Sequence, residues 1–166
     1  MAEIIGVSTW ILAGLKWGDW KNFSKYYGTI LYFILGDVLY YYLSYNHRLW
    51  SLAPTWPIKS EFVCLTGEFI VFTSTILIFL GRYPCSRFIS LWWTALWVVI
   101  YTANEWILLK TDTIKYYHGW TILDSFLFNI LLFCLLRLHY KKPSFTFVIS
   151  IPISIILIYL YSIPVN

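Results

Sequence analysis

The chain has 166 residues, of which 60% are hydrophobic, 22% are aromatic and only 12% are charged, and its formal net charge is +4. Soluble domains average roughly 45–50% apolar and roughly 25% charged residues, so this composition excludes a water-soluble single domain. The small net charge, with Lys and Arg scattered between apolar runs, also excludes a nucleic-acid-binding protein. We therefore expect much of the surface to face membrane lipids.

Apolar stretches of membrane length follow one another along the chain. A helix needs about 20 apolar residues to cross roughly 30 Å of hydrocarbon, and five stretches reach this length: residues 26–45, 61–80, 88–109, 121–138 and 144–163. Residues 4–15 form a shorter stretch that suits either a sixth span or an interfacial helix. Since a backbone in lipid must satisfy its own hydrogen bonds, we predict one all-α domain over residues 1–166. We expect a bundle of six transmembrane helices; the alternative is five helices plus an N-terminal interfacial helix.

Basic residues near the ends of these stretches predict the orientation. One side carries Lys16, Lys21, Lys25, Arg82, Arg87, Arg137, Lys141 and Lys142, and the other carries Arg48, Lys59, Lys110 and Lys115. Positively charged loops tend to stay in the cytoplasm, so the first side is predicted to be inside. Loops 46–60 and 110–120 and the C-terminus then lie outside, as does the N-terminus if residues 4–15 span.

Four of the eight acidic residues, Asp37, Glu68, Glu105 and Asp124, fall inside predicted spans, one in each of the second to fifth. Glu105 and Asp124 are expected about one turn below the outer surface, whereas Asp37 and Glu68 are expected roughly 11–12 Å below it, at about 1.5 Å per residue. All four belong to the outer half of the membrane. We therefore predict an outward-facing, carboxylate-lined pocket, to which Asn104, Asn129 and the loop residue His118 also contribute.

An ionised carboxylate near the bilayer centre costs at least roughly 2.5–3.5 kcal/mol on insertion scales. Protonation, a bound cation, or water and hydrogen-bond donors inside the bundle would offset this cost. We expect the pocket to bind or pass a cation, a proton or a small polar solute, and the residues do not identify a metal.

Two other functions are compatible with the sequence. In one, the chain is a non-catalytic membrane component that packs with lipids, partner proteins or further copies of itself, and the acids are hydrogen-bonded links between helices. In the other, it is an intramembrane lipid-modifying enzyme in which His118 and one acid form a proton-transfer pair. Walker, Rossmann and zinc-site motifs and nucleophile motifs do not occur in the sequence, so we predict no cofactor and assign no catalytic residue.

Two glycines adjoin the deeper acids. Gly36 precedes Asp37 and Gly67 precedes Glu68. Small residues let transmembrane helices approach one another closely, so we predict close helix contacts at both positions.

Several short motifs along the chain are similar to those of a known protein family. They are Trp17-Gly18-Asp19-Trp20, Gly36-Asp37 with Leu39-Tyr40, Tyr101-Thr102 with Glu105-Trp106, His118-Gly119-Trp120, and Leu136-Arg137-Leu138-His139-Tyr140-Lys141. Together they resemble a family of small, aromatic-rich polytopic membrane proteins of unknown function from spore-forming Firmicutes. The resemblance covers nearly the whole chain. It implies a multi-pass protein of a bacterial plasma membrane or a spore membrane, and it implies no activity.

Overall fold

The computed structural model describes residues 2–53 and 61–164, and the side chains of residues 4–53 and 67–164. Lys59, which the sequence assigns to the outer side, lies outside these ranges. The helices are α1 (Ala2–Trp17), α2 (Phe23–Leu43), α3 (Glu61–Phe79), α4 (Arg87–Lys110), α5 (Ile122–Lys141) and α6 (Pro143–Leu160). Each stretch predicted to be a helix is one, with ends shifted by at most a few residues, so the all-α class is confirmed.

Three of the connections between the α-helices contain a short element of their own. A 3-10 turn, η1 (Trp20–Asn22), joins α1 to α2. Strand β1 (Trp50–Leu52), after α2, pairs antiparallel with strand β2 (Ile114–Tyr116), after α4. The sequence predicted no strand, because three residues are too few to show the alternation of a sheet.

Local sequence signals explain both ends of α5. Its first turn carries a capping box, in which Thr121 accepts from the backbone of Asp124 and the Asp124 carboxylate accepts from the backbone of Thr121. At the other end, Lys142 separates α5 from α6, and Pro143 is the first residue of α6. Proline has no N–H to donate and disfavours a helical residue before it, so one helix ends here and the next begins.

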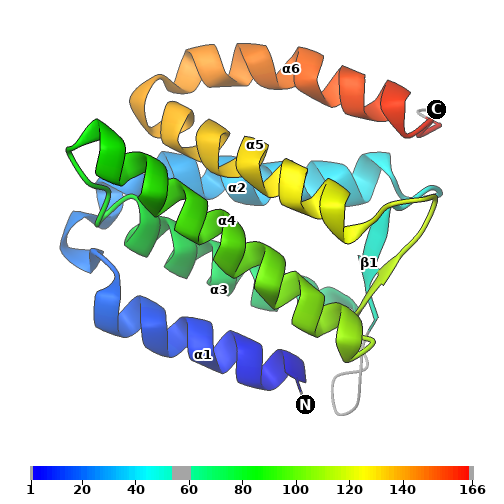
Figure 1. The fold of residues 1–166 in the computed structure, drawn as a ribbon, viewed down its shortest axis with the longest axis horizontal. Coiled ribbons are helices and arrows are strands. Elements are labelled where there is room, and N and C mark those ends of the chain that lie inside the picture. Colours follow the sequence, from blue (N-terminus) through cyan, green and yellow to red (C-terminus); the bar gives the residue numbers. More distant parts are fainter. Residues whose placement is uncertain (1, 54–60, 165–166) are drawn as a thin grey trace.

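The helices pack side by side in a bundle (Figure 1). Contacts connect α1 to α3, α3 to α2, α2 to α5, and α5 to both α4 and α6. The first turn of α1 and the last turn of α6 lie at the same end as β1, whereas the short α3–α4 and α5–α6 connections lie at the opposite end (Figure 1). We call these the sheet end and the turn end of the bundle.

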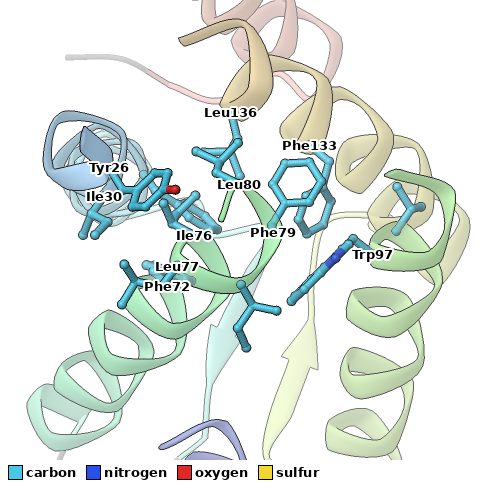
Figure 2. Close-up of a cluster of buried hydrophobic side chains, with 13 residues drawn as sticks. Tyr26, Ile30, Phe72, Ile76, Leu77, Phe79, Leu80, Trp97, Phe133 and Leu136 are labelled. Atoms are coloured by element: carbon cyan, nitrogen blue, oxygen red, sulfur yellow. The ribbon is translucent and has the colours of Figure 1, made fainter. Parts of the chain in front are cut away.

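The hydrophobic core lies toward the turn end. Side chains from α2, α3, α4 and α5 converge there, among them Ile30, Ile76, Phe79, Trp97 and Phe133 (Figure 2). They come from the halves of α2, α3 and α5 that are distant from the sheet. The bundle is therefore densely packed at the turn end.

The connection between α1 and α2 is fastened to α3. Asp19 donates its backbone N–H to the carbonyl oxygen of Leu77 at 3.2 Å, and its carboxylate accepts from the Tyr26 hydroxyl at 2.8 Å and from the Asn22 amide at 3.0 Å. These hydrogen bonds, chiefly the one from Tyr26, lower the pKa of Asp19. The Trp20 indole N–H donates to the carbonyl oxygen of Gly14 at 2.7 Å.

Helices α1 and α3 approach each other closely at two glycines. A Cβ added at Gly14 would lie 2.5 Å from Ser74 Oγ, and one added at Gly67 would lie 3.2 Å from Val7 Cγ2. A Cβ at Gly36 would meet nothing within 4 Å. The close contact predicted at Gly67 is present, but the one predicted at Gly36 is absent because Gly36 is exposed on the outside of α2.

Within the described residues, two helices are long and apolar enough to cross a membrane, α5 and α6. The lengths of α2 and α4, at 21 and 24 residues, also suffice, but polar residues reduce their mean hydropathy.

Candidate functional site

A cavity of about 230 Å³ lies among α1, α2, α3, α4 and α5 near the sheet end of the bundle. Five of the seven residues predicted for the pocket line it: Asp37 of α2, Glu68 of α3, Asn104 and Glu105 of α4, and Asn129 of α5. The fold thus brings carboxyl groups from three helices to one cavity. No Lys or Arg occurs among the described residues of its lining.

Asp37 and Glu68 present buried oxygen atoms that lack partners. Asp37 Oδ2 and Glu68 Oε2 are buried, and neither makes a hydrogen bond within the ranges that the structure describes. The two groups are also near enough to interact electrostatically. Buried polar groups are nearly always hydrogen-bonded, so two unpartnered carboxyl oxygens beside a cavity indicate a ligand, an ion or water there.

Glu105 differs from these two acids because its carboxylate already has protein partners. Its Oε1 accepts from the Tyr116 hydroxyl at 2.8 Å and from Ser125 Oγ at 2.7 Å. The Trp120 indole N–H donates to the same Ser125 Oγ at 2.8 Å. Burial raises the pKa of Tyr116, so this phenol keeps its proton and remains a donor to Glu105. These bonds link α4, β2 and α5 at one side of the cavity.

The two-stranded sheet contributes the wall at the sheet end. Trp50 and Leu52 of β1 and Ile114 of β2 line the cavity. Trp50 is held by Tyr40, whose hydroxyl accepts from the Trp50 backbone N–H and donates to the Trp50 carbonyl oxygen, both at 2.8 Å. The two rings also stack, with centroids 3.9 Å apart. This wall is therefore fixed in position by α2.

The opposite wall is continuous with the hydrophobic core. Phe33 and Phe72 line the cavity and belong to the core, and their rings stack with centroids 4.0 Å apart. Tyr101 lines the same region, and its hydroxyl lies 2.6 Å from Thr75 Oγ1. On α5, the Asn129 amide donates to Thr102 Oγ1 at 3.3 Å. The cavity thus ends at the packed half of the bundle.

Asp124 and His118 do not line the cavity. The Asp124 carboxylate is occupied by the α5 capping box and by the Tyr161 hydroxyl, which donates to Oδ1 at 2.8 Å. Burial and this bond raise the pKa of Tyr161 to about 12. The His118 ring stacks on His47, with centroids 3.6 Å apart. Asp124 was predicted at the pocket from its depth along a helix, and His118 from its place in an outer loop near the acids. Local contacts direct both side chains elsewhere.

The carboxyl groups share a cavity without meeting at a point. In the part of the chain that the structure describes, no three His, Cys, Asp or Glu side chains form a group that could hold a metal ion. The site is therefore an acid-containing cavity with mainly apolar walls.

Sequence reasoning missed Trp50, Tyr116 and Trp120 as parts of the site. Ser125 was expected among the hydrogen-bonding groups at the depth of the acids, on the same face as Asn129, and it lines the cavity. The three aromatic residues stand in loops of a chain with 10 Trp and 14 Tyr, so residue type alone does not distinguish them. Their positions depend on the pairing of β1 with β2.

Comparisons with protein-family models, with curated proteins and with solved structures gave no significant match. The resemblance to small membrane proteins of spore-forming Firmicutes stays a prediction. What the chain does has to be inferred from the cavity itself.

Proposed function

We propose that this chain is a six-span membrane protein that binds a cation in the cavity between its helices, with Asp37 and Glu68 as the principal ligands. The observation that carries this proposal is the pair of buried, unpartnered carboxyl oxygens at a cavity with no Lys or Arg among its described lining residues. A bound cation offsets the cost of burying these carboxylates and the repulsion between them.

The exposed apolar surface supports a location in the membrane. It also supports a larger number of crossings than the two most apolar helices, α5 and α6, would make. Large hydrophobic side chains are exposed on every helix, for example Leu12 at 67%, Leu91 at 67%, Leu127 at 56% and Ile156 at 63%. The helices have 16 to 24 residues, which corresponds to roughly 24–36 Å at about 1.5 Å per residue and suits a bilayer core of roughly 30 Å. Six crossings would also put both ends of the chain on one side.

The distribution of basic residues supports entry of the cation from outside. Arg82, Arg87, Arg137 and Lys141 lie at or near the turn end, where α3 connects to α4 and α5 to α6. By the positive-inside tendency this end faces the cytoplasm, so the sheet end and the cavity face the exterior. The membrane would be a bacterial plasma membrane or a spore membrane, as the resemblance implies.

The sequence left open whether each of the four acids links helices through hydrogen bonds. Glu105 is the acid whose contacts suit this role best. Its carboxylate connects β2 and α5 to α4 through two short hydrogen bonds. Asp37 and Glu68 make no such link through their buried oxygens within the described ranges. We therefore assign cation binding to Asp37 and Glu68, and a structural role at the cavity wall to Glu105.

Cation binding can be tested with the purified protein in detergent. A ligand that binds only the folded state raises the melting temperature, so we expect at least one cation from a panel of inorganic and alkylammonium salts to do so. The increase should disappear in Asp37→Asn and in Glu68→Gln, because each removes a negative charge from the cavity.

Asp124→Asn is the matched control, since Asp124 is an acid of the same region that does not line the cavity. The cation should raise the melting temperature of this variant by as much as it raises that of the parent protein. The proposal is wrong if no cation stabilises the parent protein, or if a protein that combines Asp37→Asn with Glu68→Gln responds as the parent does.

A further inference from the structure

The cavity contains two chemically different surfaces, buried carboxyl groups and aromatic walls, and we infer that its cation is a small protonated primary amine with an apolar group. This inference rests on the proposed function and names the class of ligand. The ammonium group would lie at Asp37 and Glu68, and the apolar group would lie against the aromatic side chains.

The arrangement of the acids argues against calcium as the ligand. Calcium takes about six to eight oxygen ligands, so it would require several oxygens around one point. Within the described ranges, no three potential metal-binding side chains form such a group. Glu105 Oε1 is already used by Tyr116 and Ser125. An organic cation needs no complete shell of oxygens.

The unpartnered oxygens argue for a cation that carries N–H groups. Asp37 Oδ2 and Glu68 Oε2 are buried acceptors without donors among the described residues. A primary ammonium group has three N–H donors, as the Lys side chain has, and can satisfy both oxygens at once. It neutralises one carboxylate, and the site with the ammonium bound then carries no net charge when the other carboxyl group holds a proton. A quaternary ammonium ion would leave both acceptors without a donor.

The rest of the lining suits an apolar group attached to the amine. Trp10, Phe33, Trp50, Phe72, Tyr101 and Phe128 are aromatic residues of the lining. Aromatic rings attract cations through their faces and bury alkyl or aryl groups favourably. The cavity of about 230 Å³ has room for a small amine that carries a short alkyl chain or a single ring.

The test compares four probes by titration calorimetry of the detergent-solubilised parent protein: n-butylammonium, tetramethylammonium, Na⁺ and neutral 1-butanol. We expect n-butylammonium to bind at least about tenfold more tightly than each of the others, because only it combines N–H donors, charge and an apolar chain. Equal binding of 1-butanol would overturn the inference, since charge would then not be recognised. Equal or tighter binding of tetramethylammonium would overturn it as well.

Variants locate the binding site. Asp37→Asn and Glu68→Gln should abolish butylammonium binding, and Trp10→Leu should weaken it about tenfold through loss of an aromatic wall. Trp106→Leu is the control, because Trp106 is 53% exposed and does not line the cavity. Butylammonium binding that survives both acid substitutions would overturn the inference and the proposed function together. Acid-dependent binding of Na⁺ without preference for the amine would overturn the inference alone.

Discussion

At the scale of single residues, Ser125 holds one side of the cavity together. Its hydroxyl group donates to Glu105 Oε1 at 2.7 Å and accepts from the Trp120 indole N–H at 2.8 Å. The same group lies 2.9 Å from the Tyr116 hydroxyl. Ser125 is 3% exposed, so water cannot readily replace these partners. A small hydroxyl therefore connects a buried acid to two aromatic residues, Tyr116 of β2 and Trp120 of the loop that follows.

Replacing Ser125 by Ala should lower the free energy of unfolding by about 1–3 kcal/mol, the usual cost of leaving buried polar partners unsatisfied. The Trp120 N–H would lose its acceptor and Glu105 one of its donors. Thermal unfolding in detergent measures the change. Ser86→Ala is the control, since Ser86 is exposed and makes no capping hydrogen bond at the start of α4. A loss no greater than that of the control would contradict the role assigned to Ser125.

At the scale of elements, the contact between α1 and α3 fixes the position of the first helix. The two helices meet closely at Gly14 beside Ser74, and the hydrogen bond from Asp19 to Leu77 holds the following turn against α3. The hydrogen bond from the Trp20 indole to the Gly14 carbonyl oxygen fastens the same turn to α1. Gly6, Val7 and Trp10 of α1 line the cavity. The short first helix is thus an integral part of the bundle, and it closes one side of the candidate site.

Gly14→Ala should destabilise the protein by about 1–3 kcal/mol, the typical cost of overpacking. The new Cβ would lie 2.5 Å from Ser74 Oγ and 2.9 Å from Ser74 Cβ, so the helices would have to separate. Gly28→Ala should be neutral or slightly stabilising, because nothing lies within 4 Å of that position and Ala forms helix more readily than Gly. Thermal unfolding compares the two variants, and similar effects would show that the α1–α3 contact is not tight.

At the scale of the whole molecule, the proposed six-span arrangement puts the α3–α4 and α4–α5 connections on opposite sides of the membrane. Cys85 lies exposed in the first connection. Tyr117 lies in the second and is 43% exposed. One helix, α4, separates them in the chain. Accessibility at these two positions therefore tests both the number of crossings and the orientation.

In intact cells that express the protein, a membrane-impermeant maleimide should fail to label Cys85 until the cells are permeabilised. Cys64 and Cys134 are replaced by Ser for this measurement. With Cys85 also replaced, Tyr117→Cys should be labelled without permeabilisation. Labelling of both positions from one side would show that α4 does not cross the membrane. Reversal of the two results would show that the cavity faces the cytoplasm.

The sequence by itself determined the helices and the residues whose burial is costly. Helix formation follows from long apolar runs, a local property, so all six stretches could be predicted along the chain. Asp37, Glu68 and Glu105 could be identified because a charge within an apolar run is visible without any fold. The same reasoning placed Asp124 at the pocket, since depth along a helix does not say which way a side chain turns.

Only the tertiary structure decided which of these groups meet. The pairing of Trp50 with Tyr116 across the sheet joins residues 66 positions apart, and three-residue strands leave no periodic signal in the sequence. That pairing puts Tyr116 next to Glu105 and Trp50 over the cavity. The pairing thereby gives Glu105 one of its two donors, whereas the buried oxygens of Asp37 and Glu68 have no donor within the described ranges. Contacts between distant segments depend on how the helices pack against one another, and the hydrophobicity of a local stretch does not determine that packing.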